Sequence, residues 1–207
     1  MTTEPSSLEE LYEQSALMAS SSSPAFPASA DVNKRIGVMR GNITDVGLDA
    51  IVNAANQSLL VGGGVDYAIH RAAGPQLLEE CAGIGGCPTG EARITRGYNL
   101  RAKHVIHTVG PVYYLVDDPA ALLGNCYRNT LELAVQKNVK SLAFSCISTG
   151  VYGFPSRKAA KVACETVRKF MDGHDGKKLS RVVFVTFEQR DLDAYYAVIP
   201  EYFPPPN

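Results

Sequence analysis

The chain has 207 residues, of which 45% are hydrophobic, and this suits one domain with a sizeable buried core. Its 20 basic and 21 acidic residues give a net charge of −1, so general nucleic-acid binding through a basic face is not expected. The longest apolar runs are too short to span a bilayer, so we expect no membrane partner. The five cysteines, an odd number without a Cys-X-X-Cys pair, indicate a reduced intracellular protein, cytoplasmic and/or nuclear.

Residues 1–34 differ in composition from the rest and are predicted to form an N-terminal extension, followed by one domain over residues 35–207. Within the extension, apolar residues from Leu8 to Met18 recur at roughly helical spacing, which predicts a short amphipathic helix. The stretch Ser20–Ser29 is rich in serine, proline and alanine and is typical of a flexible linker. The sequence leaves two states open for this extension: a disordered tail, or a helix that docks on the domain.

From Arg35 onward, strand-like and helix-like segments alternate along the chain. The last two strand candidates are nearly continuous apolar runs, as expected of strands buried on both faces. Strands are predicted over Ile36–Met39, Ala50–Val52, Ala92–Thr95, His104–Thr108, Leu142–Ile147 and Val182–Phe187. Helices are predicted over Val65–Ala73, Pro119–Lys137, Ser156–Met171 and Leu192–Val198. The alternation predicts an α/β fold: a three-layer α/β/α sandwich with a mixed, largely parallel central sheet.

A glycine-rich stretch follows the second predicted strand. It contains Asn53-Ala-Ala-Asn56, the triple glycine Gly62–Gly64, and Val65-Asp66 at the start of a predicted helix. Backbone without Cβ atoms before a helix N-terminus lets an anion approach main-chain N–H groups, and the polar side chains beside it can bind hydroxyl groups. The pattern favours a phosphate-bearing ligand with hydroxyl-rich parts. It matches neither the Gly-X-Gly-X-X-Gly fingerprint nor a Walker A loop.

A second polar loop, residues 146–155, lies between a buried strand and a predicted helix. Ser148 and Thr149 offer hydroxyl donors, while Gly150 and Gly153 let the backbone turn around a ligand. Ligands of parallel sheets bind beyond the carboxyl ends of the strands, so we expect both loops on one rim. Neither loop holds a lysine or a metal ligand, which favours a diphosphate bound through backbone donors. The alternative is an ordinary strand–turn–helix connection that needs two glycines.

Taken together, these residues resemble the macrodomain family of ADP-ribose-binding modules, and most closely its MacroD-type ADP-ribosyl hydrolases. The resemblance covers about Arg35 to Phe203 and rests on seven motifs in order. They are Gly41-Asn-Ile-Thr44, Asn53-Ala-Ala-Asn56, Gly62-Gly-Gly-Val-Asp66, Ile69-His-Arg-Ala-Ala-Gly74, Thr89-Gly-Glu-Ala-Arg-Ile-Thr95, His104-Val-Ile-His-Thr-Val-Gly-Pro111 and Ile147-Ser-Thr-Gly-Val-Tyr-Gly-Phe-Pro155. The resemblance implies ADP-ribose and mono-ADP-ribosylated proteins as partners, with no cofactor. We expect a monomer.

The resemblance also implies a role for each matching residue. Asn42 and Ile43 would border the adenine, and Phe187 would stack on it; the alternative for Phe187 is a place in the core. Ala54 and Asn56 would line the cleft near the distal ribose, with Asn53 close by. The distal ribose and the diphosphate would be wrapped by Gly62, Gly63, Gly64, Val65 and Asp66. The second phosphate loop would consist of Ser148, Thr149, Gly150, Val151, Tyr152, Gly153 and Phe154.

Two positions depart from the family pattern. Asn42 stands where the family usually has an aspartate that accepts a hydrogen bond from the adenine amino group. An amide oxygen accepts without charge assistance, so we expect adenine recognition to be weaker by on the order of 1 kcal/mol. Val61 stands where MacroD-type sequences often have a fourth glycine. The valine is expected to stiffen the entrance to the loop.

Hydrolysis needs a group that orients water beside the anomeric carbon of the distal ribose. Asp66 is the candidate, because it follows the glycines at a helix N-terminus, where a carboxylate is expected to be ionised. Our hypothesis is that Asp66 orients a water that the ligand's diphosphate also holds, while Asn53 keeps the ribose hydroxyls in register. The leaving group would be a protein Asp or Glu carboxylate. The alternative for Asp66 is a helix N-cap.

Three functions share this cleft. The first removes mono-ADP-ribose from acidic side chains of proteins, and the same chemistry would deacetylate O-acetyl-ADP-ribose. The second is a reader that binds ADP-ribose or ADP-ribosylated proteins without turnover. The third is a phosphatase acting on ADP-ribose 1″-phosphate. The pairing of Asp66 with Asn53 favours the first.

Several other side chains are expected to be structural. His70 lies one helical turn beyond Asp66 and could support the site, although a structural role is favoured. His104 and His107 flank a buried strand, where a hydrogen-bonded core histidine is expected. Cys81, Cys87 and His107 raise the question of zinc, but the glycine loop has the metal-free pattern, so we expect no metal. Cys146 is expected to pack inside a strand.

Overall fold

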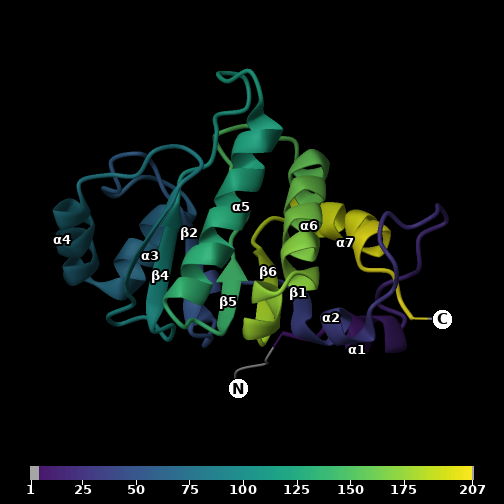
Figure 1. The fold of residues 1–207 in the computed structure, drawn as a ribbon. Helices are drawn as coiled ribbons and strands as arrows, with labels where there is room; N and C mark the ends of the chain where they lie inside the picture. Colours follow the sequence, from purple (N-terminus) through teal and green to yellow (C-terminus); the bar gives the residue numbers. More distant parts are fainter. Residues whose placement is uncertain (1–4, 207) are drawn as a thin grey trace.

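The computed structural model describes residues 5–206 and confirms the predicted fold class (Figure 1). A six-stranded sheet has the order β1-β6-β5-β2-β4-β3, and every neighbouring pair is parallel except the antiparallel pair β3–β4. The strands are β1 Ile36–Arg40, β2 Ala50–Ala54, β3 Ala92–Arg96, β4 His104–Thr108, β5 Ser141–Phe144 and β6 Arg181–Thr186. The helices are α1 Leu8–Glu13, α2 Ala30–Arg35, α3 Val65–Ala73, α4 Pro75–Ile84, α5 Pro119–Gln136, α6 Ser156–Asp172 and α7 Gln189–Tyr202, with short 3-10 turns at η1 Ile43–Asp45 and η2 Asp175–Lys178.

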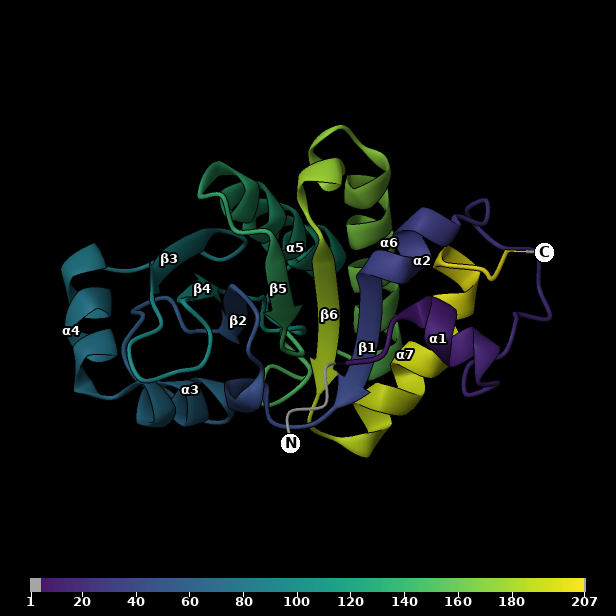
Figure 2. The same ribbon diagram turned by 90° about the horizontal axis from the view of Figure 1, so that it is seen from below.

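The sheet is buried on both faces, and successive residues of a strand enter opposite cores. In β6, Val182 and Phe184 join the core beneath α5, α6 and α7, while Val183 and Val185 join the core beneath α3 and α4. Figure 2 shows α3 on one side of the sheet and α5 and α6 on the other. This double burial explains the continuous apolar runs of the sequence.

The predicted elements needed three kinds of correction. Strand β5 ends at Phe144 and β6 ends at Thr186, before the predicted ends at Ile147 and Phe187. The predicted strands were too long because the apolar runs continue beyond the ladder hydrogen bonds. Helix α7 is longer than predicted at both ends. Helices α2 and α4 were not predicted. Helix α4 begins with a proline in its first turn and is followed by the C-cap Gly85, which has the left-handed conformation; its buried side carries Leu77 and Cys81.

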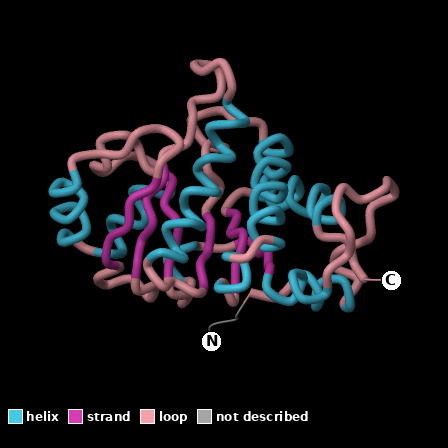
Figure 3. Tube along the Cα trace, in the orientation of Figure 1, coloured by secondary structure: helices cyan, strands magenta, loops and turns pink. Residues whose placement is uncertain are grey.

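The N-terminal extension packs on the domain, which is the docked state of the two that the sequence left open. Leu8 is fully buried, and the hydroxyl of Tyr12 donates to the carbonyl of Phe203 (2.8 Å). The guanidinium of Arg168 donates to the carbonyls of Pro27 (2.8 Å) and Tyr202 (2.7 Å). Figure 3 shows that the segment between α1 and α2 is a loop without regular secondary structure. The predicted boundary at residue 34 stays a prediction, and residues 1–4 of the extension lie outside the described residues.

Within residues 5–206, no helix combines the length and apolar character that a membrane span requires. The longest helix, α5, has 18 residues and shows one buried face and one exposed face.

Candidate functional site

A cleft with two lobes lies at the carboxyl ends of the parallel strands, between the two glycine-containing loops. One lobe has a volume of about 400 Å³ and the other about 470 Å³. The lobes share four lining residues: Gly64, Val65, Cys146 and Gly150. The first turn of α3 therefore stands at the junction, where its free N–H groups favour an anion.

The first lobe brings together most of the residues predicted to surround the distal ribose and diphosphate. Its predicted members are Ala54, Asn56, Gly62, Gly63, Gly64, Val65, Asp66, Ser148, Gly150, Val151 and Tyr152. Three more lining residues, Ala55, Gly110 and Cys146, were not predicted as site residues. At Gly110 an added Cβ would lie 2.1 Å from Ser148 Oγ, so only glycine leaves room for the second loop there.

The second lobe contains the residues predicted to hold the adenine, together with the shared junction residues. Asn42, Ile43, Thr149 and Phe187 line it. The ring of Phe187 is 73% exposed, so this residue is not in the core; its stacking on adenine stays a prediction. Asn42 Oδ1 accepts a hydrogen bond from the backbone N–H of Thr44 (3.2 Å), and this bond caps η1.

Three predicted site residues do not line the cleft. Asn53 is fully buried beneath the first lobe, at the end of β2. Phe154 is buried against the ring of Tyr113, and Gly153 supports the turn of the second loop with a φ of 70°. These residues shape the loops from below, and any ligand contact by them stays a prediction.

Asp66 and Asn53 form a direct buried pair. Asn53 Nδ2 donates to Asp66 Oδ1 (2.6 Å), and the backbone N–H of Gly62 donates to Asp66 Oδ2 (2.5 Å). Asp66 is only 3% exposed, yet it lines the first lobe. The N-cap of α3 is Gly64, so Asp66 is not the N-cap. Its carboxylate instead ties the glycine loop to the end of β2.

The orientation of the Asn53 amide is set by His107, whose role the sequence analysis missed. Asn53 Nδ2 lies 3.1 Å from His107 Nδ1, and His107 Nε2 lies 3.0 Å from Thr95 Oγ1. The two hydrogens of the Asn53 amide are then donated to Asp66 and to His107 Nδ1. Because Nδ1 accepts, the ring hydrogen is on Nε2, which donates it to Thr95. Burial, together with the nearby His70, lowers the pKa of His107 to about 3, so the ring is neutral at physiological pH.

This network leaves an unpartnered acceptor in the buried layer directly beneath the first lobe. Asn53 Oδ1 is buried and has no hydrogen-bond partner among residues 5–206. Rotating the amide by 180° would place its oxygen against the Asp66 carboxylate at the 2.6 Å contact, which is unfavourable. A hydroxyl donor on a bound ligand would satisfy Oδ1, and ribose supplies such donors.

His70, Cys81 and His107 gather beneath the pair, with ligand-type atoms within 4.8 Å of one another. Cys87, which the sequence grouped with them, lies elsewhere, and its thiol contacts the carbonyl of Pro88. Burial raises the pKa of Cys81 to about 11, so this thiol stays protonated. Both ring nitrogens of His107 are used in hydrogen bonds, so neither has a lone pair available for a metal ion. The cluster is therefore better suited to supporting the Asp66–Asn53 pair than to binding a metal. His70 Nε2 lies 3.5 Å from Asp66 Oδ1.

The second loop is held by hydrogen bonds in a conformation in which several of its residues line the cleft. Ser148 has a φ of 65°, an unusual backbone for a residue with a side chain, and its hydroxyl has no partner within residues 5–206. The N–H of Phe154 donates to the carbonyl of Ser148 (2.9 Å), which closes the turn. Thr149 is tied down by Asp191, which accepts from its hydroxyl (3.2 Å) and was not predicted.

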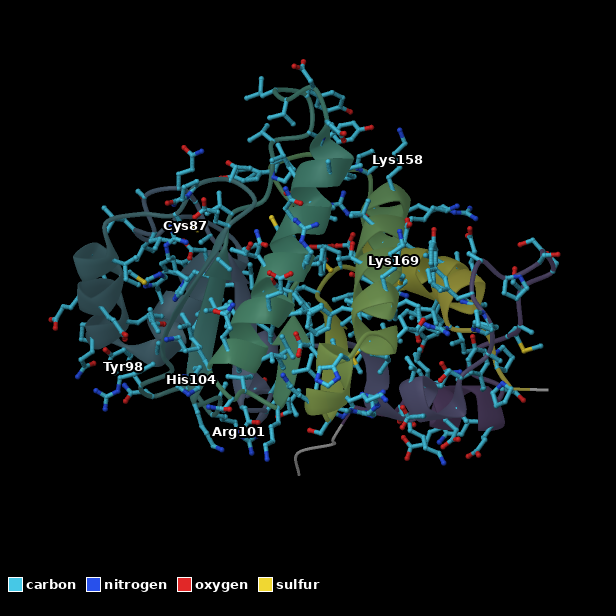
Figure 4. The ribbon with its side chains drawn as sticks, in the orientation of Figure 1. Cys87, Tyr98, Arg101, His104, Lys158 and Lys169 are labelled. Atoms are coloured by element: carbon cyan, nitrogen blue, oxygen red, sulfur yellow. The ribbon has the colours of Figure 1, made fainter. Side chains whose placement is uncertain are left out.

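The structure corrects the expected place of Cys146 and shows where His104 lies. Cys146 lies beyond the end of β5 and lines both lobes, so it is not inside a strand as predicted. Burial raises the pKa of its thiol, which disfavours a nucleophilic role. His104 lies at the amino end of β4, on the same side as Arg101 in Figure 4 and away from the cleft.

Comparisons with known proteins identify the family of this chain. The Macro domain family model matches residues 52–163. The Macro domain-containing protein CT2219 of Chlorobaculum tepidum is 53% identical over 164 residues, which make up 79% of this chain and 94% of that protein. ADP-ribose glycohydrolase MACROD1 of Rattus norvegicus is 46% identical over 185 residues, covering 87% of this chain and 70% of that protein. Among solved structures, the Trypanosoma brucei macrodomain in complex with ADP-ribose matches with a TM-score of 0.76 and 46% identity, covering 84% of this chain and 72% of that one. The chain therefore belongs to the macrodomain family.

Proposed function

We propose that this macrodomain is a hydrolase that removes mono-ADP-ribose from Asp and Glu side chains of proteins. The observation that carries the proposal is the Asp66–Asn53 pair on the floor of the first lobe, beside the two loops suited to a diphosphate. Support also comes from the relatives, one of which is named an ADP-ribose glycohydrolase and another of which is solved with ADP-ribose.

In this mechanism the ligand spans both lobes, with adenine beside Phe187 and the distal ribose above Asp66. Backbone donors of the two loops and the N-terminus of α3 hold the diphosphate. Each carboxylate oxygen of Asp66 keeps a lone pair beyond its bond to Asn53 or Gly62, and so it can accept from a water. Asn53 Oδ1 accepts from a ribose hydroxyl and fixes the ring above that water.

The water attacks the anomeric carbon of the distal ribose, and a new C–O bond forms there. The bond from that carbon to the protein carboxylate breaks, and the carboxylate leaves with the electron pair. Asp66 accepts the hydrogen bond of the water and takes its proton as the new bond forms. A carboxylate is a good leaving group, so positioning of the water supplies much of the rate. With O-acetyl-ADP-ribose, the same bound water would instead attack the carbonyl carbon of the acetyl ester; the bond from that carbon to the ribose oxygen breaks, acetate is released, and the ribose oxygen takes up a proton.

The test is release of ADP-ribose from a protein modified on Asp and Glu, with a protein modified on arginine as the control. Arginine carries the ADP-ribose on nitrogen and is a poorer leaving group, so the mechanism predicts release from the acidic sites only. Tight ADP-ribose binding without release from either substrate would make the protein a reader. Release of phosphate from ADP-ribose 1″-phosphate, without release from proteins, would make it a phosphatase.

We infer further that the protein acts inside the cell on mono-ADP-ribosylated proteins, as a monomer and without general nucleic-acid binding. Its five cysteines, all within residues 5–206, are free thiols, and this composition suits a reducing compartment. The net charge of −1 gives little attraction for polyanions. Cell fractionation tests the location, and size-exclusion chromatography tests the monomeric state.

A further inference from the structure

The modified protein must lie at one particular end of the cleft. Under the proposed function, on which this inference rests, ADP-ribose is joined to its protein through the distal ribose. That ribose sits over Asp66 in the first lobe, whereas Phe187 stands in the other lobe. The polypeptide therefore leaves the cleft past the rims of the first lobe. The two rims are residues 58–61, next to the triple glycine, and residues 111–118 together with Val151.

These two rims carry most of the large apolar side chains that the described chain exposes. Nine large hydrophobic residues are exposed within residues 5–206, and five of them stand on these rims. Val151 is 99% exposed, Tyr114 79% and Leu115 78% on one rim, and Leu60 and Val61 are 46% and 41% exposed on the other. The exposed apolar side chains thus stand on both sides of the lobe through which the polypeptide leaves, and gathered exposed apolar side chains are typical of interaction surfaces.

The rim of residues 111–118 is held firmly against the second loop. The backbone N–H of Tyr113 donates to the carbonyl of Tyr152 (2.9 Å), and Tyr152 lines the first lobe. The ring of Tyr113 packs on Phe154, with 4.7 Å between ring centroids, and its hydroxyl accepts from Lys158 Nζ (2.9 Å). Figure 1 shows the loop that precedes α5 projecting beyond the rest of the molecule, and Lys158 lies on the same side in Figure 4.

The anchoring residues leave the tips of this rim open. Tyr114 meets Tyr113 edge-on, with 4.9 Å between centroids, and then presents most of its ring to solvent. On the facing rim, the side-chain amide of Asn56 donates to the carbonyl of Leu60 (2.9 Å), and the hydroxyl of Ser58 accepts from the N–H of Leu60 (3.2 Å). Both rims are therefore preformed, and their apolar side chains have no evident part in the core.

We propose that the two rims bind the polypeptide segment on either side of the ADP-ribosylated acidic residue, and that they prefer apolar or aromatic neighbours. Asp117 is exposed on the same loop and disfavours further acidic residues nearby. The rims thus distinguish one modified acidic site from another, while the cleft recognises the ADP-ribose that all sites share.

The experiment compares two substrates that differ only in the group attached to the distal ribose. One is a peptide with an ADP-ribosylated glutamate between leucine and phenylalanine, and the other is O-acetyl-ADP-ribose, which has no polypeptide. The variant Leu115→Glu places a charge on the rim without touching the cleft, and Tyr114→Ser is a second variant. Met18→Glu is the matched control, because Met18 is 69% exposed and lies on the N-terminal extension.

We expect the KM for the peptide to rise about tenfold in Leu115→Glu, with kcat/KM for O-acetyl-ADP-ribose unchanged within about twofold. Met18→Glu should behave as the wild type with both substrates. Equal loss for both substrates, or no loss for either in both rim variants, overturns the proposal. Melting temperatures confirm that each variant is folded.

A binding measurement separates this inference from the proposed hydrolysis. The probes are the same peptide and one with glycine and serine neighbours, each joined to ADP-ribose through a hydrolysis-resistant linkage. We expect the wild type to bind the leucine–phenylalanine peptide about tenfold tighter, and Leu115→Glu to lose this difference. Equal affinity of the wild type for the two peptides refutes the docking surface. If the preference is present but the wild type releases no ADP-ribose, the proposed hydrolysis fails and the docking surface stands.

Discussion

Replacing His107 tests whether the orientation of the Asn53 amide controls turnover. His107 lies in β4 directly beside Asn53 in β2, and it accepts one of the two amide hydrogens. Leucine at this position would remain apolar and buried but would accept no hydrogen bond. Asparagine would place an amide oxygen close to the position of Nδ1 and restore the acceptor. The two variants therefore separate hydrogen bonding from packing.

The size of the effect follows from the buried network. In His107→Leu, one hydrogen of Asn53 Nδ2 would be left unpaired in a fully buried place, at a cost of about 1–3 kcal/mol. Turning the amide to avoid this cost would set its oxygen against Asp66, where the contact is 2.6 Å. Both routes disfavour the arrangement in which Asn53 Oδ1 faces the ribose. We expect kcat to fall about 5- to 150-fold.

The assay is the initial rate of ADP-ribose release from a protein modified on Asp and Glu, with melting temperatures as a check on folding. His107→Asn should keep kcat within about threefold of the wild type, because the acceptor is restored. Thr95 should tolerate both changes, since its hydroxyl also contacts the carbonyls of Arg96 and Val105. A folded His107→Leu variant with the kcat of the wild type would show that His107 does not control the orientation of the Asn53 amide during turnover.

Three further outcomes are expected. The pKa of His107 is lowered to about 3 from an ordinary value near 6.5, so its neutral form contributes its full stabilisation above pH 6.5 and loses it as the pH falls toward 3. Between pH 7 and 5, the free energy of unfolding measured in urea should fall by about 2 kcal/mol more in the wild type than in His107→Asn. Equal losses in the two proteins would contradict this. Phe187→Ala should weaken ADP-ribose binding about 5- to 100-fold by calorimetry while leaving the free energy of unfolding nearly unchanged, because the ring is 73% exposed; a loss of stability instead would mean a packing role. Arg168→Met should cost about 2–4 kcal/mol of unfolding free energy, because the carbonyls of Pro27 and Tyr202 lose their donor; an unchanged denaturation midpoint would show that the extension contributes little to stability.

The sequence was sufficient for the sheet and for the two loops, because both leave local signals. Strands that are buried on both faces have continuous apolar sequences, and the glycine loops follow these sequences directly. The same signal failed at strand ends. Ile147 is fully buried although β5 ends at Phe144, so the apolar run reports burial rather than ladder pairing.

The part of the site that could not be predicted depends on strand pairing. Asn53 and His107 are 54 residues apart, and they meet only because β2 and β4 pair in one particular register. Asn53 was predicted as a site residue, whereas His107 had the pattern of an ordinary histidine at the end of a buried strand. Asp191 is similar, because it reaches Thr149 from a helix 42 residues further along the chain. Docking of the extension likewise rests on Tyr12 meeting Phe203, a contact across 191 residues.

Removing the Asp66 carboxylate tests whether this group positions the attacking water. Release of ADP-ribose from a protein modified on Asp and Glu is measured for the wild type and for Asp66→Ala, with ADP-ribose affinity measured for both by calorimetry. We expect release by the wild type, loss of release in the variant, and binding retained in both. Turnover by Asp66→Ala at the rate of the wild type would show that the Asp66 carboxylate does not position the water.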